Sequence, residues 1–357
     1  MENVGTENLK DPHFHKNKSI FSFSIQIKYG GWRPSQRMDI QILSGAAATF
    51  GDSDHREQTM EIMETKNRIR HMLPRVAAVA RRYVHPYRKG LMVAKNWVVL
   101  SVKQLFGIKS DEKLSDFVWE TGIAQMSGYK RKPNPSLFAK ARKYAKEGAL
   151  VLIYDELVRE FYRGRQLRLV GEDSTDMPAF FTKKDTEARL GHRTQKRREQ
   201  QLNEMTGKDK KEKAWVLGYK LHIMEDCEIG LPLIAVVKTA DVHDSRPFYE
   251  LFPQVVDNFN LQYEGKFLGD SAFDSADIRK RVREVNEMDD VIAINGRGHY
   301  PSETPKDKDY GKRWFLEQTN SVLETTYNLT SNRMRGIKKI TIHAFACLIA
   351  NFMEHFM

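Results

Sequence analysis

The order of strand-like and helix-like patterns in the second half of this 357-residue sequence most constrains its fold. Three strand-like runs come first, and helices and strands then alternate up to the C-terminus. Apolar or alternating residues predict strands at 167–170, 215–223 and 231–237, then one ending at Asp270 and one at 291–294. Helical periodicity predicts helices at about 245–259 and 275–286, followed by two more. The predicted order is β-β-β-α-β-α-β-α.

That order is the arrangement of the RNase H-like fold. We therefore predict an α/β catalytic domain over residues 166–357, with a mixed five-stranded sheet flanked by helices. In this fold the first strand, the end of the fourth strand and a late helix converge at one edge. A long insertion at about 176–214 separates the first two strands, and its residues 183–213 carry 11 Lys/Arg against 6 Asp/Glu. We expect a basic loop there that contacts DNA.

The first half of the chain has a different pattern. Residues 61–165 show apolar residues at helical spacing, broken by glycines, and predict an all-helical domain. Residues 1–60 lack sustained periodicity and are expected to form a loosely ordered extension. In the helix after Pro135, Lys140 and Arg142 belong to a cationic cluster that either faces phosphates or is a solvated helix face.

Composition limits the classes of partner. A net charge of +11 favours a polyanion such as nucleic acid. Cys227 and Cys347 lack the spacing of a zinc site or a disulfide framework. No apolar run reaches the roughly 20 residues of a membrane span, so no membrane partner is expected. With no secretory signal apparent, we expect a cytoplasmic, nucleoid-associated protein.

Carboxylates stand where the predicted fold converges. Asp173 continues the first strand, Asp270 ends the fourth, and the late helix offers Glu317 or Glu324, which are seven residues apart on one face. Phosphodiester chemistry commonly uses two divalent cations about 3.5–4 Å apart. Because Mg²⁺ prefers oxygen ligands, a few carboxylates are enough to hold it. The sequence thus predicts a two-metal phosphodiester site.

Other acidic residues near these positions have simpler interpretations. Asp176 is the weaker alternative to Asp173, because it lies further from the strand. Asp274 and Ser275 are expected to cap the next helix. The segment His243-Asp244, shortly before Pro247, is interpreted as a helix start rather than as a catalytic pair.

Three aromatic side chains are candidates for stacking on an unpaired base at a DNA end. They are Tyr310, Trp314 and Trp215. For Trp215, which lies in a strand-like run, we expect packing in the core instead.

Several ordered motifs together resemble the DDE transposases of prokaryotic insertion sequences, over about residues 90–355. The matching segments are Asp173-Ser174-Thr175, Gly218-Tyr219-Lys220-Leu221-His222, residues 237–245, residues 269–274 and Tyr310-x-x-Arg313-x-x-x-Glu317. The resemblance implies that Asp173, Asp270 and Glu317 are catalytic and hold two Mg²⁺ or Mn²⁺ ions, which favours Glu317 over Glu324. One position departs from the family, because many relatives have a lysine where this chain has Glu324.

The helical domain at 61–165, with Pro133-x-Pro135-Ser136-x-Phe138, is also similar to the N-terminal DNA-binding region of such enzymes. The resemblance further implies a function. The expected protein binds the inverted repeats of its element as double-stranded DNA, hydrolyses a strand at each end and joins the end to target DNA, as a homodimer in the synaptic complex. The alternatives are a metal-dependent RNase H-like nuclease without strand transfer, and a non-catalytic DNA-binding relative. The residues expected to contact DNA are Tyr310, Arg313, Lys140, Arg142, Arg197, Arg198, Arg333, Arg335 and Lys338.

Overall fold

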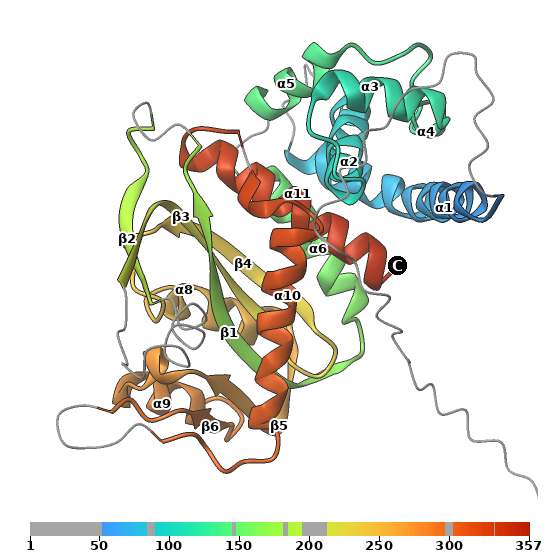
Figure 1. The fold of residues 1–357 in the computed structure, drawn as a ribbon. Helices are drawn as coiled ribbons and strands as arrows, with labels where there is room; N and C mark the ends of the chain where they lie inside the picture. The colour runs from blue at the N-terminus through green and yellow to red at the C-terminus, as the bar shows by residue number, and fades with distance from the viewer. Residues whose placement is uncertain are drawn as a thin grey trace, which may run out of the picture. The chain divides into compact units, whose positions relative to one another are not determined.

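The computed structural model describes residues 52–83, 90–144, 148–180, 185–194, 213–296, 303–331 and 333–357. Most of the predicted N-terminal extension, at 1–51, and the centre of the basic insertion, at 195–212, lie outside the described residues. Figure 1 shows the helical region and a twisted sheet with helices on both of its faces.

The sheet contains six strands in mixed orientation. Its bounds are β1 (Gln166–Pro178), β2 (Arg189–Thr194), β3 (Lys213–Asp226), β4 (Leu231–Thr239), β5 (Asn260–Gly269) and β6 (Asp289–Ile292). The spatial order is β2-β3-β1-β5-β6, and β4 pairs with β3 on the same side as β2. The β1, β3 and β4 strands pair antiparallel, whereas β5 lies parallel to β1 and to β6. This mixed α/β sheet confirms the predicted fold class, with β2 as an added strand.

The expected basic loop is partly a strand. Instead of ending near Asp173, β1 continues to Pro178, and β2 pairs with the first half of β3. The β2 strand forms because its backbone pairs with β3. Its sequence, Arg189–Thr194, has no apolar run that would indicate a strand. Gly191 is required at this pairing, because a Cβ on it would lie 2.1 Å from the Ala240 carbonyl oxygen.

Helices cover both faces of the sheet. On one face lie α6 (Ala149–Phe161), α10 (Trp314–Thr325) and α11 (Ile337–His355), with α10 against β1 and α11 against β4. On the other face, α8 (Phe248–Asn258) packs against β3 and β4, and Phe248 and Phe252 stack near Phe267 of β5. The remaining helix of this region, α9 (Ala276–Arg283), packs against β6.

The helical region contains α1 (Asp52–Tyr83), α2 (Gly90–Leu105), α3 (Asp111–Glu120), α4 (Ile123–Met126) and α5 (Pro135–Tyr144). Helix α1 begins at Asp52, inside the segment predicted to be a loose extension, and continues through Pro74. The α11 helix, buried from Ile342 to Met353, packs against both α2 and β4, and thereby connects the helical region to the sheet.

Close approach of α10 to β1 depends on Gly171. A Cβ at this position would lie 2.7 Å from Cys227 Sγ and 2.8 Å from Leu316 Cδ1. Leu316 and Cys227 belong to a small apolar cluster with Leu169 and Leu268 beneath the start of α10. The absence of a side chain at residue 171 therefore sets the height of α10 above the strand.

A buried carboxylate fixes the segment that leads into α10. Asp309 is 4% exposed and precedes the short helix η2 (Tyr310–Arg313). It lies 3.2 Å from an Arg168 nitrogen on β1 and 3.0 Å from Lys266 Nζ on β5. Burial alone would raise the pKa of Asp309, but the hydrogen bonds from Lys266 and Arg168 outweigh it and hold that pKa well below its usual range.

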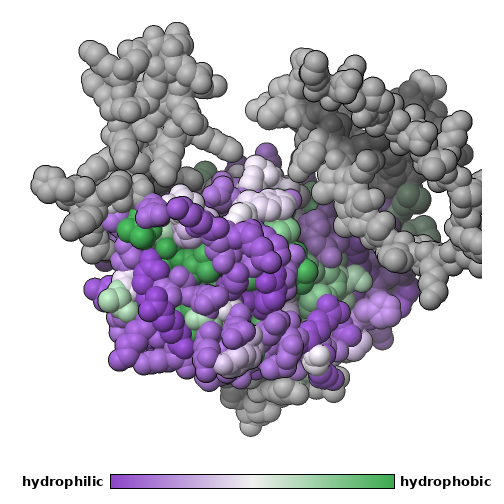
Figure 2. Space-filling model, turned by 90° about the horizontal axis from the view of Figure 1, so that it is seen from below, coloured by the Kyte–Doolittle hydropathy of each residue, from purple (hydrophilic) through white to green (hydrophobic). Residues whose placement is uncertain are grey.

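The surface seen in Figure 2 is largely hydrophilic, with smaller hydrophobic areas between the polar side chains. Within the ranges that the structure describes, no helix combines the length and the apolar character needed to cross a membrane.

We predict that Gly171→Ala lowers the free energy of unfolding by about 1–3 kcal/mol, because the added methyl overpacks the contact between β1 and α10. Thermal and urea denaturation measure the change. Gly311→Ala is the matched control, because a Cβ at residue 311 meets nothing within 4 Å. An unfolding free energy for Gly171→Ala equal to that of the control would contradict the role of residue 171.

Asp309→Asn is expected to destabilise the fold by about 2 kcal/mol at pH 7, since hydrogen bonds to charged groups contribute on that order. The folded pKa of Asp309 lies below its unfolded value near 3.9, so its stabilisation is present above that pH and is lost as the pH falls. The gap between wild type and variant should therefore narrow in urea titrations below pH 4. Asp277→Asn, which alters an exposed pair with Arg281, should change stability little at either pH.

Candidate active site

The three predicted carboxylates converge on one guanidinium group. An Arg313 nitrogen lies 3.9 Å from Asp173 Oδ1 and 3.8 Å from Asp270 Oδ2. Another nitrogen of the same group donates a 3.1 Å hydrogen bond to Glu317 Oε1. The Arg313 side chain is only 16% exposed, so this cation is held within the site rather than in solvent.

Each carboxylate is positioned by a different element. Asp173 lies in the middle of β1 and accepts a 3.1 Å hydrogen bond from Asn320 Nδ2 of α10. Asp270 directly follows β5 and accepts from the Ala272 backbone N–H at 2.8 Å, which begins the short helix η1 (Ser271–Phe273). Glu317 lies in the first turn of α10, with a side chain that is 67% exposed.

Burial raises the pKa of Asp173 to about 6, although the nearby Arg313 charge opposes the shift. The adjacent Asp270 and Asp244 carboxylates raise it further. Burial and neighbouring negative charge thus destabilise the ionised form of Asp173, and a cation nearby stabilises that form. In the described residues no three acidic, histidine or cysteine side chains are already arranged as a metal site. The three carboxylates instead surround the Arg313 guanidinium, which is a planar cation rather than a spherical ion.

Glu324 occupies a separate position further along α10. Thr175 Oγ1 donates a hydrogen bond to its carboxylate, two residues beyond Asp173 on the same face of β1. The two glutamates that sequence spacing could not separate are therefore divided by geometry. Glu317 meets Asp173 and Asp270 through Arg313, while Glu324 ties the second half of α10 to β1.

Asp244 lies beside the site, a place that sequence analysis missed. It was expected to start a helix, but α8 begins at Phe248, and the capping residue Pro247 makes no side-chain bond. The Asp244 carboxylate instead accepts hydrogen bonds of 2.8 Å from both Ser174 Oγ and Lys220 Nζ. Lys220 and His222 are two positions apart in the motif quoted above. This spacing in a predicted strand was the sequence evidence that both side chains lie on the same face of the sheet.

Two polar side chains lie buried on the face of the sheet opposite α10. Glu172 and His222 are both 0% exposed, and their side-chain oxygens and nitrogens have no hydrogen-bond partner in the described part of the chain. Burial raises the pKa of Glu172 well above its usual range and lowers that of His222 to about 4. A pKa near 4 leaves His222 neutral at pH 7, and burial favours the protonated, uncharged form of Glu172.

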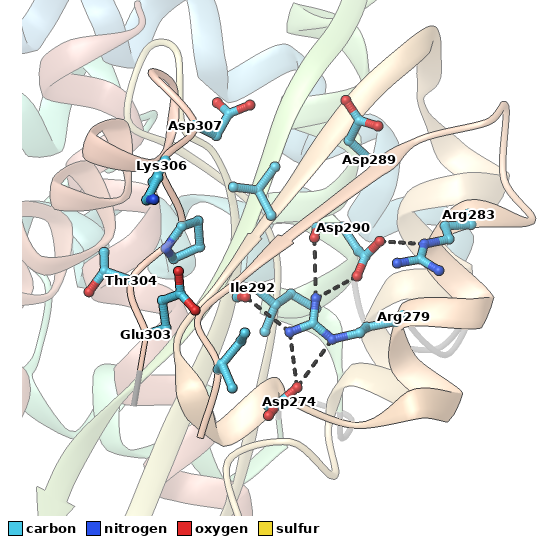
Figure 3. A pocket seen from close by; sticks show the side chains of 13 residues that line it. Asp274, Arg279, Arg283, Asp289, Asp290, Ile292, Glu303, Thr304, Lys306 and Asp307 are labelled. Atoms are coloured by element: carbon cyan, nitrogen blue, oxygen red, sulfur yellow. Dashed lines mark hydrogen bonds and ion pairs between the residues drawn. The ribbon is translucent and has the colours of Figure 1, made fainter. Parts of the chain in front are cut away.

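Asp274 also differs from its expected capping role. Helix α9 has Ser275 at its cap position with no side-chain capping bond. The Asp274 carboxylate accepts from Arg279 and from the Asn295 backbone N–H, and Arg279 in turn contacts Asp290 at 2.6 Å (Figure 3). These ion pairs line a pocket beside β6, and they hold the segment after Asp270 in place.

The aromatic candidates are divided between surface and core. Trp215, which was expected in the core, is 62% exposed. It lies in the first part of β3, which pairs with β2, whereas β1 pairs with β3 from Gly218 onward. Trp314 is 51% exposed and stacks on Phe315. Tyr310 is half-buried and packs against the small apolar cluster under α10.

The predicted DNA-contacting cations fall in three places. Arg313 lies in the site itself. Lys140, Arg333, Arg335 and Lys338 are exposed in the helical region and near the start of α11. Arg142 pairs with the Asp111 carboxylate and is largely buried, and Arg197 and Arg198 lie outside the described residues.

Comparison with known proteins shows the family of this chain. No curated protein sequence matches the chain. A cryo-EM structure of the piggyBac transposase synaptic complex with hairpin DNA aligns with 84% of this chain and 74% of its own, at 10% sequence identity and a TM-score of 0.37. The sequence model of the transposase DDE domain matches residues 168–353. Because this match covers more than half of the chain and confirms the resemblance drawn from its motifs, the protein belongs to the transposase DDE domain family.

Proposed function

We propose that this protein cleaves DNA strands at the ends of a transposable element and joins those ends to target DNA, with divalent metal ions held by Asp173, Asp270 and Glu317. The observation that carries the proposal is the convergence of these three carboxylates on the Arg313 guanidinium. Oxygen donors gathered around a single cation are the ligand type that Mg²⁺ and Mn²⁺ prefer. Membership of the DDE family supports the same chemistry.

The residues around the site suit phosphoryl transfer. Metal ions bound there would supply Lewis-acid stabilisation of charge on the reacting phosphate. Asn320 and the Ala272 N–H each hold one aspartate in place, so these two ligands are pre-positioned. Glu317 is 67% exposed and would complete the set of metal ligands from the first turn of α10. Arg313, one turn earlier, would supply a guanidinium for a DNA phosphate.

Two successive reactions follow at this site. In the first, a water oxygen bonds to the phosphorus at the element end while the bond to the 3′ oxygen breaks, which leaves a 3′-hydroxyl. In the second, that hydroxyl oxygen bonds to a target phosphorus and displaces a target 3′ oxygen. Each step needs the nucleophile and leaving group in line. Bringing two ends together requires two sites, so we propose a homodimer assembled on DNA.

The acidic residues are tested with DNA that carries the terminal sequences flanking the gene. Wild type with Mg²⁺ is expected to cut and join this DNA. Asp270→Ala and Asp173→Asn should reduce both reactions by at least about 10³-fold, while binding in gel-shift assays is retained. Asp277→Asn, on the exposed face of α9, is the control for loss of one carboxylate.

Each remaining outcome has a defined meaning. Cutting without joining would identify a nuclease of the same fold, and end binding with neither reaction would identify a non-catalytic relative. If Asp270→Ala cuts as fast as wild type, the proposed site is wrong.

Arg313 supplies a separate test that uses metal binding alone. If its guanidinium neutralises the three carboxylates before DNA arrives, Arg313→Gln should bind Mn²⁺ more tightly than wild type by about tenfold, as one nearby like charge is removed. Strand cleavage by the same variant should fall. Isothermal titration calorimetry measures the affinity, with Lys312→Gln as the control, because Lys312 pairs with Glu228 and Asp309 instead. Equal Mn²⁺ affinity in Arg313→Gln and wild type would refute the neutralising role.

A further inference from the structure

A large groove lies where the helical region meets the sheet. It has a volume of about 1250 Å³ and runs between two walls. The first wall comes from the end of α2, the start of α3 and Arg142 of α5. The second comes from the end of β1, the short helix η3 (Leu329–Ser331) and the first turns of α11. We name it the α2–α11 groove.

Positive charge dominates this groove. Its six cations are Lys103, Lys109, Arg142, Arg333, Arg335 and Lys339, and its two carboxylates are Asp111 and Glu112. Asp111 forms ion pairs with Lys103, at 2.8 Å, and with Arg142. These pairs connect α2, α3 and α5 in the first wall. The other four cations, Lys109, Arg333, Arg335 and Lys339, are exposed, and Glu112 is the second carboxylate of the lining. An excess of like charge in a concave surface favours a polyanion.

One aromatic side chain lines the groove beside these cations. Phe180 follows the end of β1 and is 51% exposed. The Arg333 guanidinium lies over its ring, 5.6 Å from the centroid. An exposed ring with a cation stacked on it presents apolar and positive surface together, which suits the sugar and phosphate of a nucleic acid strand.

The distance between the groove and the candidate active site can be counted along β1. This strand and α10 run side by side in the same direction from the site to the groove. Three contacts show this register: Leu316 meets residue 171, Asn320 meets Asp173, and Glu324 meets Thr175. Four helical residues at about 1.5 Å each match two strand residues at about 3.3 Å each. Both elements end at the groove, β1 at Pro178 and the segment after α10 at Asn328.

From Asp173 to Pro178 is five strand residues, or about 17 Å along β1. Phosphates along one DNA strand are about 3.4 Å apart in projection on the helix axis. We propose that the α2–α11 groove binds the backbone of the element end about five nucleotides from the phosphate that is cleaved. This inference rests on the proposed function and adds the location of a DNA contact to it.

The charge of the groove is tested by a double variant, Arg333→Gln with Lys339→Gln, in anisotropy titrations of a labelled duplex end. Loss of two phosphate contacts should weaken binding about 30-fold at 0.15 M salt and lower the slope of log K against log salt by about 1.8. The matched control is Lys280→Gln with Arg281→Gln, which removes two exposed cations from α9. Circular dichroism checks that both variants are folded.

The position of the contact is tested by replacing single phosphates with neutral methylphosphonates. Substitution four to six nucleotides from the cleaved phosphate should weaken binding by wild type and leave binding by the groove variant unchanged. Weakening only at other positions, or equal weakening in both proteins, would overturn the proposal. So would groove and control variants that bind alike.

The catalytic proposal can fail separately from this one. Asp270→Ala retains the groove and should show the wild-type methylphosphonate pattern without cutting. If groove variants bind normally while Asp270→Ala is inactive, the groove proposal fails and the active site stands. If the pattern is as expected but wild type neither cuts nor joins, the reverse holds.

Discussion

The packing of α10 against β1 determines where the three carboxylates meet. Because residue 171 has no side chain, Leu316 reaches the strand, and the following turns of the helix stay in register with it. Asn320 then reaches Asp173, and Glu317, one turn earlier, contacts Arg313, which also lies 3.8 Å from Asp270. A small change in the height of the helix would separate these side chains, because the groups that bridge the two elements are already at hydrogen-bonding distance.

Gathering carboxylates in one place creates an electrostatic problem that the fold resolves locally. Repulsion and burial both disfavour three charged groups at the edge of a sheet. The Arg313 guanidinium offsets that charge within the site, and Lys220 does so for Asp244. For Glu172, which precedes Asp173 in β1, burial favours the uncharged form of the carboxyl group. The outcome is a site in which one guanidinium offsets part of the negative charge of three carboxylates.

Sequence was sufficient for features that local patterns determine. The alternation of strands and helices from β4 onward, the position of Asp270 after β5 and the late helix with Glu317 all follow from periodicity along one segment. Features that depend on contacts distant in sequence were missed. Asp244 meets a serine 70 residues away, Asp309 meets an arginine 141 residues away, and β2 exists only because β3 offers it a partner. Trp215 was misplaced because alternation in a strand indicates two faces but not whether a helix covers one of them.

Glu324 lies between the candidate active site and the proposed DNA groove. In the family that the motifs resemble, many members have a lysine here, seven residues after the glutamate that corresponds to Glu317. In this chain the same position is bonded to Thr175 and lies between Asp173 and the groove on both elements. An anion held there cannot contact a phosphate, so a strand passing along α10 would meet its first cations further on, at Arg333 and beyond. The exposed cations around the start of α11 therefore offer a physical compensation for the lysine that residue 324 lacks.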